Sequence, residues 1–113
     1  MTTIYHNPRC GKSRQTLAIL QEKGEEVSIV EYLKTQPDAV ELEKIISMLG
    51  IKPEQLIRKG ESIYKEHYKG KELSDQEWIA AMVQHPILIE RPIVLKNGKA
   101  ALGRPPENVE TIL

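Results

Sequence analysis

The chain has 113 residues, of which 40% are hydrophobic and 28% charged, as in an ordinary globular protein. Sixteen Lys and Arg residues balance sixteen Asp and Glu residues, so any site for an anion has to be local. No charged leader precedes an apolar segment, and no apolar run is long enough to cross a bilayer. We therefore expect one domain, cytoplasmic, with neither nucleic acid nor membrane as its partner.

The first third of the chain predicts a strand, a helix and a second strand. Thr2–Tyr5 is short and β-prone, and Gly11–Lys23 has apolar residues at helical spacing before Gly24. Val27–Val30 then forms the second β-like run. Short loops between these elements indicate a right-handed βαβ unit with parallel strands.

The middle of the chain is predicted to be helical. Apolar residues of Leu42–Leu49 fall on one helix face, and Pro53 suits the first turn of a short helix. Ser74 begins a capping box ahead of another apolar stripe. The polar stretch Arg58–Lys71 indicates no definite conformation.

The last third returns to strands. Asn97-Gly98 separates the β-like runs Ile93–Lys96 and Lys99–Leu102, which is a strong hairpin signal. Pro105 and Pro106 suit the start of a closing helix. The whole chain therefore predicts an α/β protein with a thioredoxin-like βαβ…ββα sheet and a helical insertion at about residues 38–85, between the two halves.

Cys10 is the only cysteine and lies between the first predicted strand and the first predicted helix. A free thiol fits a reducing compartment. Because a helix N-terminus stabilises an anion, this position favours a thiolate over a buried apolar cysteine. The nearby residues that add cationic support are His6, Arg9, Lys12 and Arg14.

Cys10-Gly11-Lys12-Ser13 matches the C-x-x-S pattern at the first helix of a thioredoxin-like fold. With Ser13 in place of a second cysteine, a thiol from outside has to resolve a mixed disulfide. His6 has two interpretations: it helps hold Cys10 as thiolate, or it is a loop histidine bonded to backbone. No cluster of ligands has metal-binding spacing, so no metal is expected.

Two arginines that each precede a proline are candidate oxyanion ligands, because a guanidinium makes paired charge-assisted hydrogen bonds. Arg91 precedes the third predicted strand and Arg104 follows the fourth. Arg91-Pro92 is the candidate for a cis peptide bond. Arg58 reaches inward or is solvated, and the alternative for all three is a surface ion pair, with Glu90 as an obvious local partner.

Four motifs resemble the glutathione/glutaredoxin-dependent arsenate reductase family, in order and over essentially the whole chain. They begin at His6-Asn7-Pro8, Leu56-Ile57-Arg58-Lys59, Gln84-His85-Pro86 and Gly103-Arg104-Pro105, and the first and third extend to Arg14 and Val94. The resemblance implies a thioredoxin-like fold with a helical insertion. It also implies reduction of arsenate to arsenite, with glutathione as co-substrate, no bound cofactor, and glutaredoxin as protein partner.

By this resemblance Cys10 is the nucleophile, His6 lowers its pKa and Ser13 supports the thiolate. The residues implied to bind the oxyanion are Arg58, Arg91 and Arg104, and those supporting the anion loop are Asn7, Gly11, Lys12 and Arg14. Two alternatives stay open. One is a glutathione-dependent thiol-disulfide oxidoreductase with a substrate other than arsenate. The other is a regulator that binds RNA polymerase, like the Spx proteins, although Ser13 breaks the C-x-x-C switch common in that group.

Overall fold

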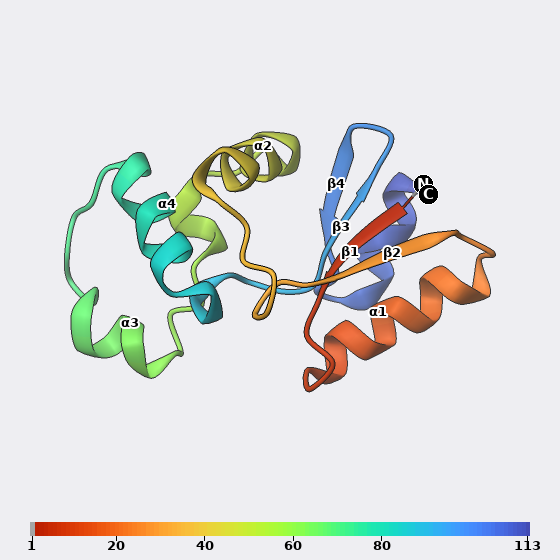
Figure 1. Ribbon diagram of the computed structural model, residues 1–113, viewed down its shortest axis with the longest axis horizontal. Coiled ribbons are helices and arrows are strands. Elements are labelled where there is room, and N and C mark those ends of the chain that lie inside the picture. Colours follow the sequence, from red (N-terminus) through yellow and green to blue (C-terminus); the bar gives the residue numbers. More distant parts are fainter. Residues whose placement is uncertain (1) are drawn as a thin grey trace. The chain divides into compact units, whose positions relative to one another are not determined.

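The computed structural model describes residues 2–113. They belong to two compact units: one runs up to Thr35 and resumes at Arg91–Leu113, and the other is Gln36–Glu90. The first unit contains strands β1 to β4, and the second contains helical elements, their loops and an isolated β-bridge between Ile57 and Ile89 (Figure 1). The candidate thiol Cys10 therefore belongs to the unit with the sheet.

The sheet has the strand order β2-β1-β3-β4. Its strands are β1 (Thr2–His6), β2 (Val27–Glu31), β3 (Ile93–Lys96) and β4 (Lys99–Leu102). β1 runs parallel to β2 and antiparallel to β3, and β3 and β4 form an antiparallel hairpin. This topology confirms the predicted βαβ…ββα sheet and its thioredoxin-like arrangement.

Helix α1 (Gly11–Glu22) and the 3₁₀ helix η3 (Pro106–Ile112) share one apolar core with the sheet (Figure 1). Because successive strand residues face opposite sides, the sheet residues of this core lie on one face. The core consists of Ile4, Leu20, Val94, Ala101 and Val109. The closing helix predicted after Pro105 exists, but its hydrogen bonds span three residues, as from Asn108 N–H to Pro105 O at 3.0 Å.

The turn between β3 and β4 has the backbone that the sequence predicts. Asn97 has a φ of 51° and Gly98 a φ of 75°. Positive φ at both central residues is the mark of a type I′ turn, whose twist matches that of the strands it joins. This turn lies at the opposite end of β1 from Cys10, because Lys96 pairs with Thr2 while Cys10 follows His6.

The second unit contains α2 (Ala39–Leu49), α3 (Ser62–His67) and α4 (Asp75–Gln84), with 3₁₀ helices η1 (Pro53–Leu56) and η2 (Pro86–Leu88). α4 contacts α2, η1 and η2. The side chains buried in this unit include Leu42, Ile45, Ile46, Leu56, Trp78, Ile79, Met82, Leu88 and Ile89. The helices predicted from apolar spacing are thus confirmed.

Local capping fixes where these helices begin and end. Asp38 accepts the Glu41 N–H at 2.8 Å at the start of α2, and Gly50 ends that helix with a φ of 68°. At α4 the predicted capping box forms: Ser74 Oγ accepts the Glu77 N–H at 3.2 Å, and Glu77 accepts the Ser74 N–H at 2.9 Å. Such reciprocal bonds satisfy amides that the helix itself cannot.

The sequence does not indicate helix α3 or the short 3₁₀ helix η2. Tyr64 is the one buried residue of α3, and the Tyr64 ring lies 6.3 Å from that of Trp78 in α4. A six-residue helix with one buried side chain leaves no periodic apolar pattern to detect.

None of the helices in the described part of the chain has the length and apolar character needed to span a membrane. Within residues 2–113, no three His, Cys, Asp or Glu side chains come together as a possible metal site.

Candidate active site

Cys10 is the N-cap residue of α1. Its backbone is extended, with φ −93° and ψ 123°, and its carbonyl accepts the Arg14 N–H at 3.0 Å. The residue is buried, with 8% of its surface exposed. An N-cap side chain lies beside the free amides of the first helical turn. The helix therefore places the sulfur where an anion is stabilised.

The loop between β1 and α1 holds this position through its own hydrogen bonds. The Cys10 N–H donates to Asn7 O, and the Arg9 N–H donates to Asn7 Oδ1, both at 3.0 Å. Arg14 Nη1 donates to Pro8 O at 2.9 Å. Asn7 and Arg14, predicted to support the loop, therefore contact it directly.

The thiol pKa is the balance of burial against three cationic or dipolar groups. Burial raises the pKa of Cys10, but the backbone N–H groups of Ser13 and Lys12 and the Arg91 guanidinium together lower it below its usual value. The Ser13 and Lys12 N–H groups act on the thiol as backbone hydrogen-bond donors, as the free amides of a first helical turn can. The expectation of an acidic thiol thus has a physical basis in this geometry.

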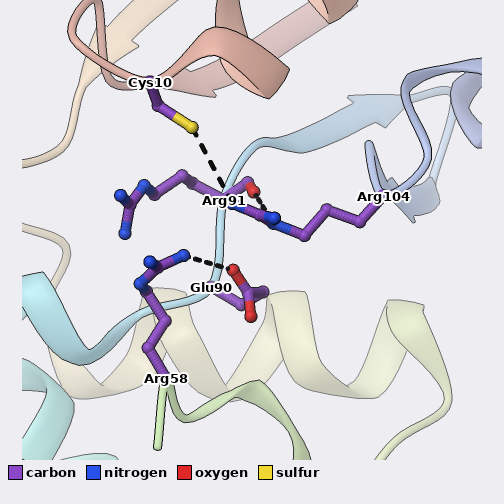
Figure 2. Close-up of polar contacts among 5 residues, drawn as sticks. All are labelled: Cys10, Arg58, Glu90, Arg91 and Arg104. Carbon is purple, nitrogen blue, oxygen red and sulfur yellow. Dashed lines mark hydrogen bonds and ion pairs between the residues drawn. The ribbon is translucent and has the colours of Figure 1, made fainter. Parts of the chain in front are cut away.

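Arg91 and Arg104 converge on the sulfur (Figure 2). Arg104 Nη2 donates to Cys10 Sγ at 3.8 Å, and Arg104 Nε donates to Arg91 O at 2.8 Å. Both Arg91-Pro92 and Arg104-Pro105 are cis, which confirms the expectation for the first. Arg91 just before β3 and Arg104 just after β4 therefore both place a guanidinium group beside the thiol.

Ser13 supports the thiolate through its backbone rather than its hydroxyl. Ser13 is fully buried; its Oγ lies 2.6 Å from His6 Nδ1, to which it is hydrogen-bonded, and accepts the Asn7 N–H at 3.1 Å. Burial lowers the pKa of His6 and the charge of Arg14 lowers it further, against the raising effect of Glu31. His6 therefore contacts the site through Ser13.

Arg58 belongs to the other compact unit and is paired there with Glu90 (Figure 2). Arg58 Nη1 donates to Glu90 Oε1 at 2.8 Å, and each side chain is about a quarter exposed, at 23% and 24%. The backbone aligns them: the Arg58 N–H donates to Leu88 O at 2.7 Å, and the Glu90 N–H to Leu56 O at 2.8 Å. The ion pair foreseen for Glu90 therefore forms with Arg58.

The remaining residues near Cys10 differ in their exposure and in their effect on the thiol. Arg9, Gly11 and Lys12 are exposed, and Lys12 acts on Cys10 through its backbone N–H. Sequence reasoning did not single out Asn108, whose Nδ2 donates to Arg104 O at 2.9 Å. Asn108 lies in a polar segment after Pro105-Pro106, and nothing in that segment predicts that its side chain will hydrogen-bond to the Arg104 carbonyl.

A thioredoxin-like sheet with an acidic thiol beside two arginines, at the start of its first helix, is typical of proteins whose chemistry depends on a reactive cysteine. Comparison with known proteins identifies the family within that class. The chain matches the ArsC family over residues 5–112, and it belongs to that family.

The relatives are similar over nearly their whole length. The chain is 49% identical to "Uncharacterized protein YfgD" of Escherichia coli K12, covering 97% of this chain and 94% of that protein. It is 46% identical to an arsenate reductase of Neisseria meningitidis serogroup A, covering 97% and 96%. The solved structure of an arsenate reductase from Vibrio cholerae matches with a TM-score of 0.96 and 47% identity, covering 99% and 97%.

Proposed function

We propose that this protein is an arsenate reductase in which the Cys10 thiolate attacks arsenate and in which glutathione and glutaredoxin supply the electrons. The observation that carries the proposal is the lowered pKa of Cys10 beside two guanidinium groups. Arsenate is a tetrahedral oxyanion, and paired guanidinium donors suit such a ligand. The names of the Neisseria and Vibrio relatives support the same substrate.

The proposed reaction begins when Cys10 Sγ forms a bond to As(V) and one arsenate oxygen leaves as water after protonation. A glutathione thiol then displaces a second oxygen, which also leaves as water. The glutaredoxin thiolate attacks the glutathione sulfur, so that the arsenic–sulfur bond to glutathione breaks and its electron pair reduces As(V) to As(III). Water finally releases arsenite and returns Cys10 as a thiol. Two thiols are thereby oxidised to one mixed disulfide.

The side chains of this chain have separate tasks in the proposal. Arg91 and Arg104 hold the arsenate oxygens and stabilise the sulfur, and Arg58 is proposed as a third oxyanion ligand. Asn7, Gly11, Lys12 and Arg14 are proposed to keep the loop in place, and His6 and Ser13 to fix the first helical turn. An entering oxyanion and the thiolate are both negative, so the guanidinium groups have to offset their repulsion.

The experiment is a steady-state assay of arsenite formation from arsenate, glutathione and glutaredoxin. Cys10→Ser is expected to abolish turnover, because no other thiol exists in the chain. Arg104→Lys and Arg91→Lys are each expected to lower kcat/KM by about tenfold or more, since a charged hydrogen bond is worth roughly 1.5–3 kcal/mol.

The matched control for the arginine variants is Lys99→Gln, an exposed cation at the hairpin turn, which is expected to retain the wild-type rate. Full turnover by Cys10→Ser, or no arsenite from the wild-type protein, would contradict the proposal.

A second candidate is a thiol-disulfide oxidoreductase that acts on glutathione mixed disulfides. The 49% identity to a relative without a characterised function favours testing it beside arsenate. Cys10 would then attack the mixed disulfide, releasing the reduced substrate and leaving glutathione on Cys10 for a second thiol to remove. Turnover of a glutathione mixed disulfide, with no arsenite formed from arsenate, identifies this alternative.

Two further expectations stay predictions: a cytoplasmic location and the absence of a nucleic acid or membrane partner, both of which rest on composition. A regulator that binds RNA polymerase is the second open alternative to an arsenate reductase. Co-purification of polymerase with the chain, without turnover in either assay, would favour the regulator.

A further inference from the structure

Gly103 lies where β4 ends and the segment that carries Arg104 begins. It is buried, and its N–H donates to Pro92 O at 2.9 Å. Unlike Gly98, it does not have a left-handed φ. Backbone conformation therefore does not require glycine at this position, and the reason has to be space.

A side chain at Gly103 has no room. A Cβ added there would lie 2.6 Å from Pro92 Cγ and 3.2 Å from Pro92 Cδ, and closer still to Thr16 Oγ1. Neither neighbour yields easily. The Pro92 ring is rigid, and Thr16 is β-branched and fully buried, with its hydroxyl donating to Lys12 O at 2.8 Å. Even an alanine would thus move backbone on one side or the other.

One neighbour of Gly103 lies on the helix that carries the Cys10 sulfur, and the other lies beside an arginine that acts on it. Thr16 belongs to α1, whose N-cap residue is Cys10, and Pro92 directly follows Arg91, which lowers the thiol pKa. Gly103 itself precedes Arg104, whose Nη2 reaches Sγ at 3.8 Å. Helix α1, the loop before β3 and the loop after β4 therefore come together at Gly103, in the space that a side chain there would occupy.

We propose that Gly103 is a positioning residue: its missing side chain sets how closely α1, which carries Cys10 at its N-cap, approaches Arg91 and Arg104. The catalytic consequence rests on the proposed function, whereas the consequence for thiol reactivity does not. An alanine would move the guanidinium groups away from the sulfur, while the amides of the first turn of α1 would stay beside it. The stabilisation of the thiolate by the arginines would weaken and burial would still oppose the charge, so the thiol pKa would rise.

The test is the pH dependence of Cys10 alkylation by iodoacetamide in Gly103→Ala. The midpoint is expected to move upward by about one pH unit, which is roughly a tenfold loss of thiolate below the midpoint. In the arsenate assay kcat is expected to fall by a similar factor. A merely structural role would lower the urea unfolding midpoint and leave the alkylation profile of the folded protein unchanged, which would overturn the proposal.

The matched control is Gly60→Ala. Gly60 is exposed, has no left-handed φ, and has no atom within 4 Å of an added Cβ. This variant is expected to keep both the wild-type alkylation midpoint and the wild-type kcat. A shift as large as that of Gly103→Ala would overturn the proposal.

A second variant tests the steric cause. Adding Thr16→Ala to Gly103→Ala removes the nearest obstructing atom and is expected to return the midpoint part of the way, with Thr16→Ala alone as the reference. If Gly103→Ala does not fold, the alkylation midpoint of the double variant tests the proposal instead. If neither folds, Gly103 is a requirement of the fold and the proposal is wrong. Failure of the wild type to form arsenite would end the proposed function and leave the alkylation result to decide this inference.

Discussion

The Cys10 sulfur combines burial with an acidic thiol, two properties that usually oppose each other. Burial alone disfavours a charge, and an isolated buried cysteine is inert. Here the amides of Lys12 and Ser13 and the Arg91 guanidinium outweigh burial. Cys10 is 8% exposed, so these groups act on a sulfur that has little competing water.

The pH dependence of alkylation tests this balance in the wild-type protein. The thiolate is the reactive form, and a pKa lowered in the folded state keeps it present at a pH where an ordinary cysteine is protonated. The alkylation rate is expected to reach half its maximum at a lower pH in the folded protein than in urea, and to fall as pH falls through the folded-state pKa. Identical midpoints in the two states would contradict the assigned cause.

The same difference in pKa has a consequence for stability. The unfolded state binds a proton on Cys10 over a range in which the folded state does not, so stability rises with pH across that range. The contribution of Cys10 is complete above the unfolded-state pKa and is lost as pH falls through the lowered folded-state pKa.

At the scale of elements, the isolated bridge between Ile57 and Ile89 orders the Arg58–Glu90 ion pair. The backbone hydrogen bonds of Arg58 and Glu90 beside this bridge hold the two residues next to each other, independently of the attraction between their charges. Pre-positioned and partly shielded charges lose less side-chain entropy on pairing than exposed ones.

Glu90→Gln is therefore expected to lower the free energy of unfolding by about 1 kcal/mol, measured by urea denaturation. Glu54→Gln is the matched control, because the Glu54–Lys59 pair lies in the same unit with side chains that are 49% and 56% exposed. Its loss is expected to be below about 0.5 kcal/mol. Equal losses in the two variants would show that the bridge adds nothing to the Arg58 pair.

Elements with local signals could be predicted from the sequence. The Asn97-Gly98 turn, the Ser74 capping box and the apolar face of α2 each depend on residues within a few positions of one another. Helix α3 could not be predicted, because its single buried residue, Tyr64, is explained only by Trp78 in another helix.

The sequence suggested which residues to compare with the structure, but not the contacts that they make. Cys10, Arg91 and Arg104 follow from motif position, and the structure brings these three together. The Arg58–Glu90 ion pair and the crowding of Gly103 against Thr16 join residues far apart in the chain. The hydrogen bond between His6 and Ser13 spans a short stretch but depends on the rotamer of a buried hydroxyl. No spacing in the sequence encodes such contacts, since they depend on how the side chains pack.

At the scale of the whole molecule, equal numbers of acidic and basic residues give a formal net charge of zero at pH 7. Without net repulsion between copies, solubility is expected to be lowest near neutral pH and to rise on either side. The measurement is the concentration of polyethylene glycol that precipitates the protein at pH 5.5, 7 and 8.5. A monotonic trend across these values would contradict the expectation.

The single thiol of this chain also limits how it can be damaged. In the absence of other thiols, a disulfide has to join two copies through Cys10, with their sulfurs about 2 Å apart. Each sulfur lies recessed beside guanidinium groups, and two such cationic surfaces repel at close range. Dimerisation by air oxidation is therefore disfavoured, and small oxidants such as peroxide are expected to oxidise Cys10 more readily than a second copy of the chain does.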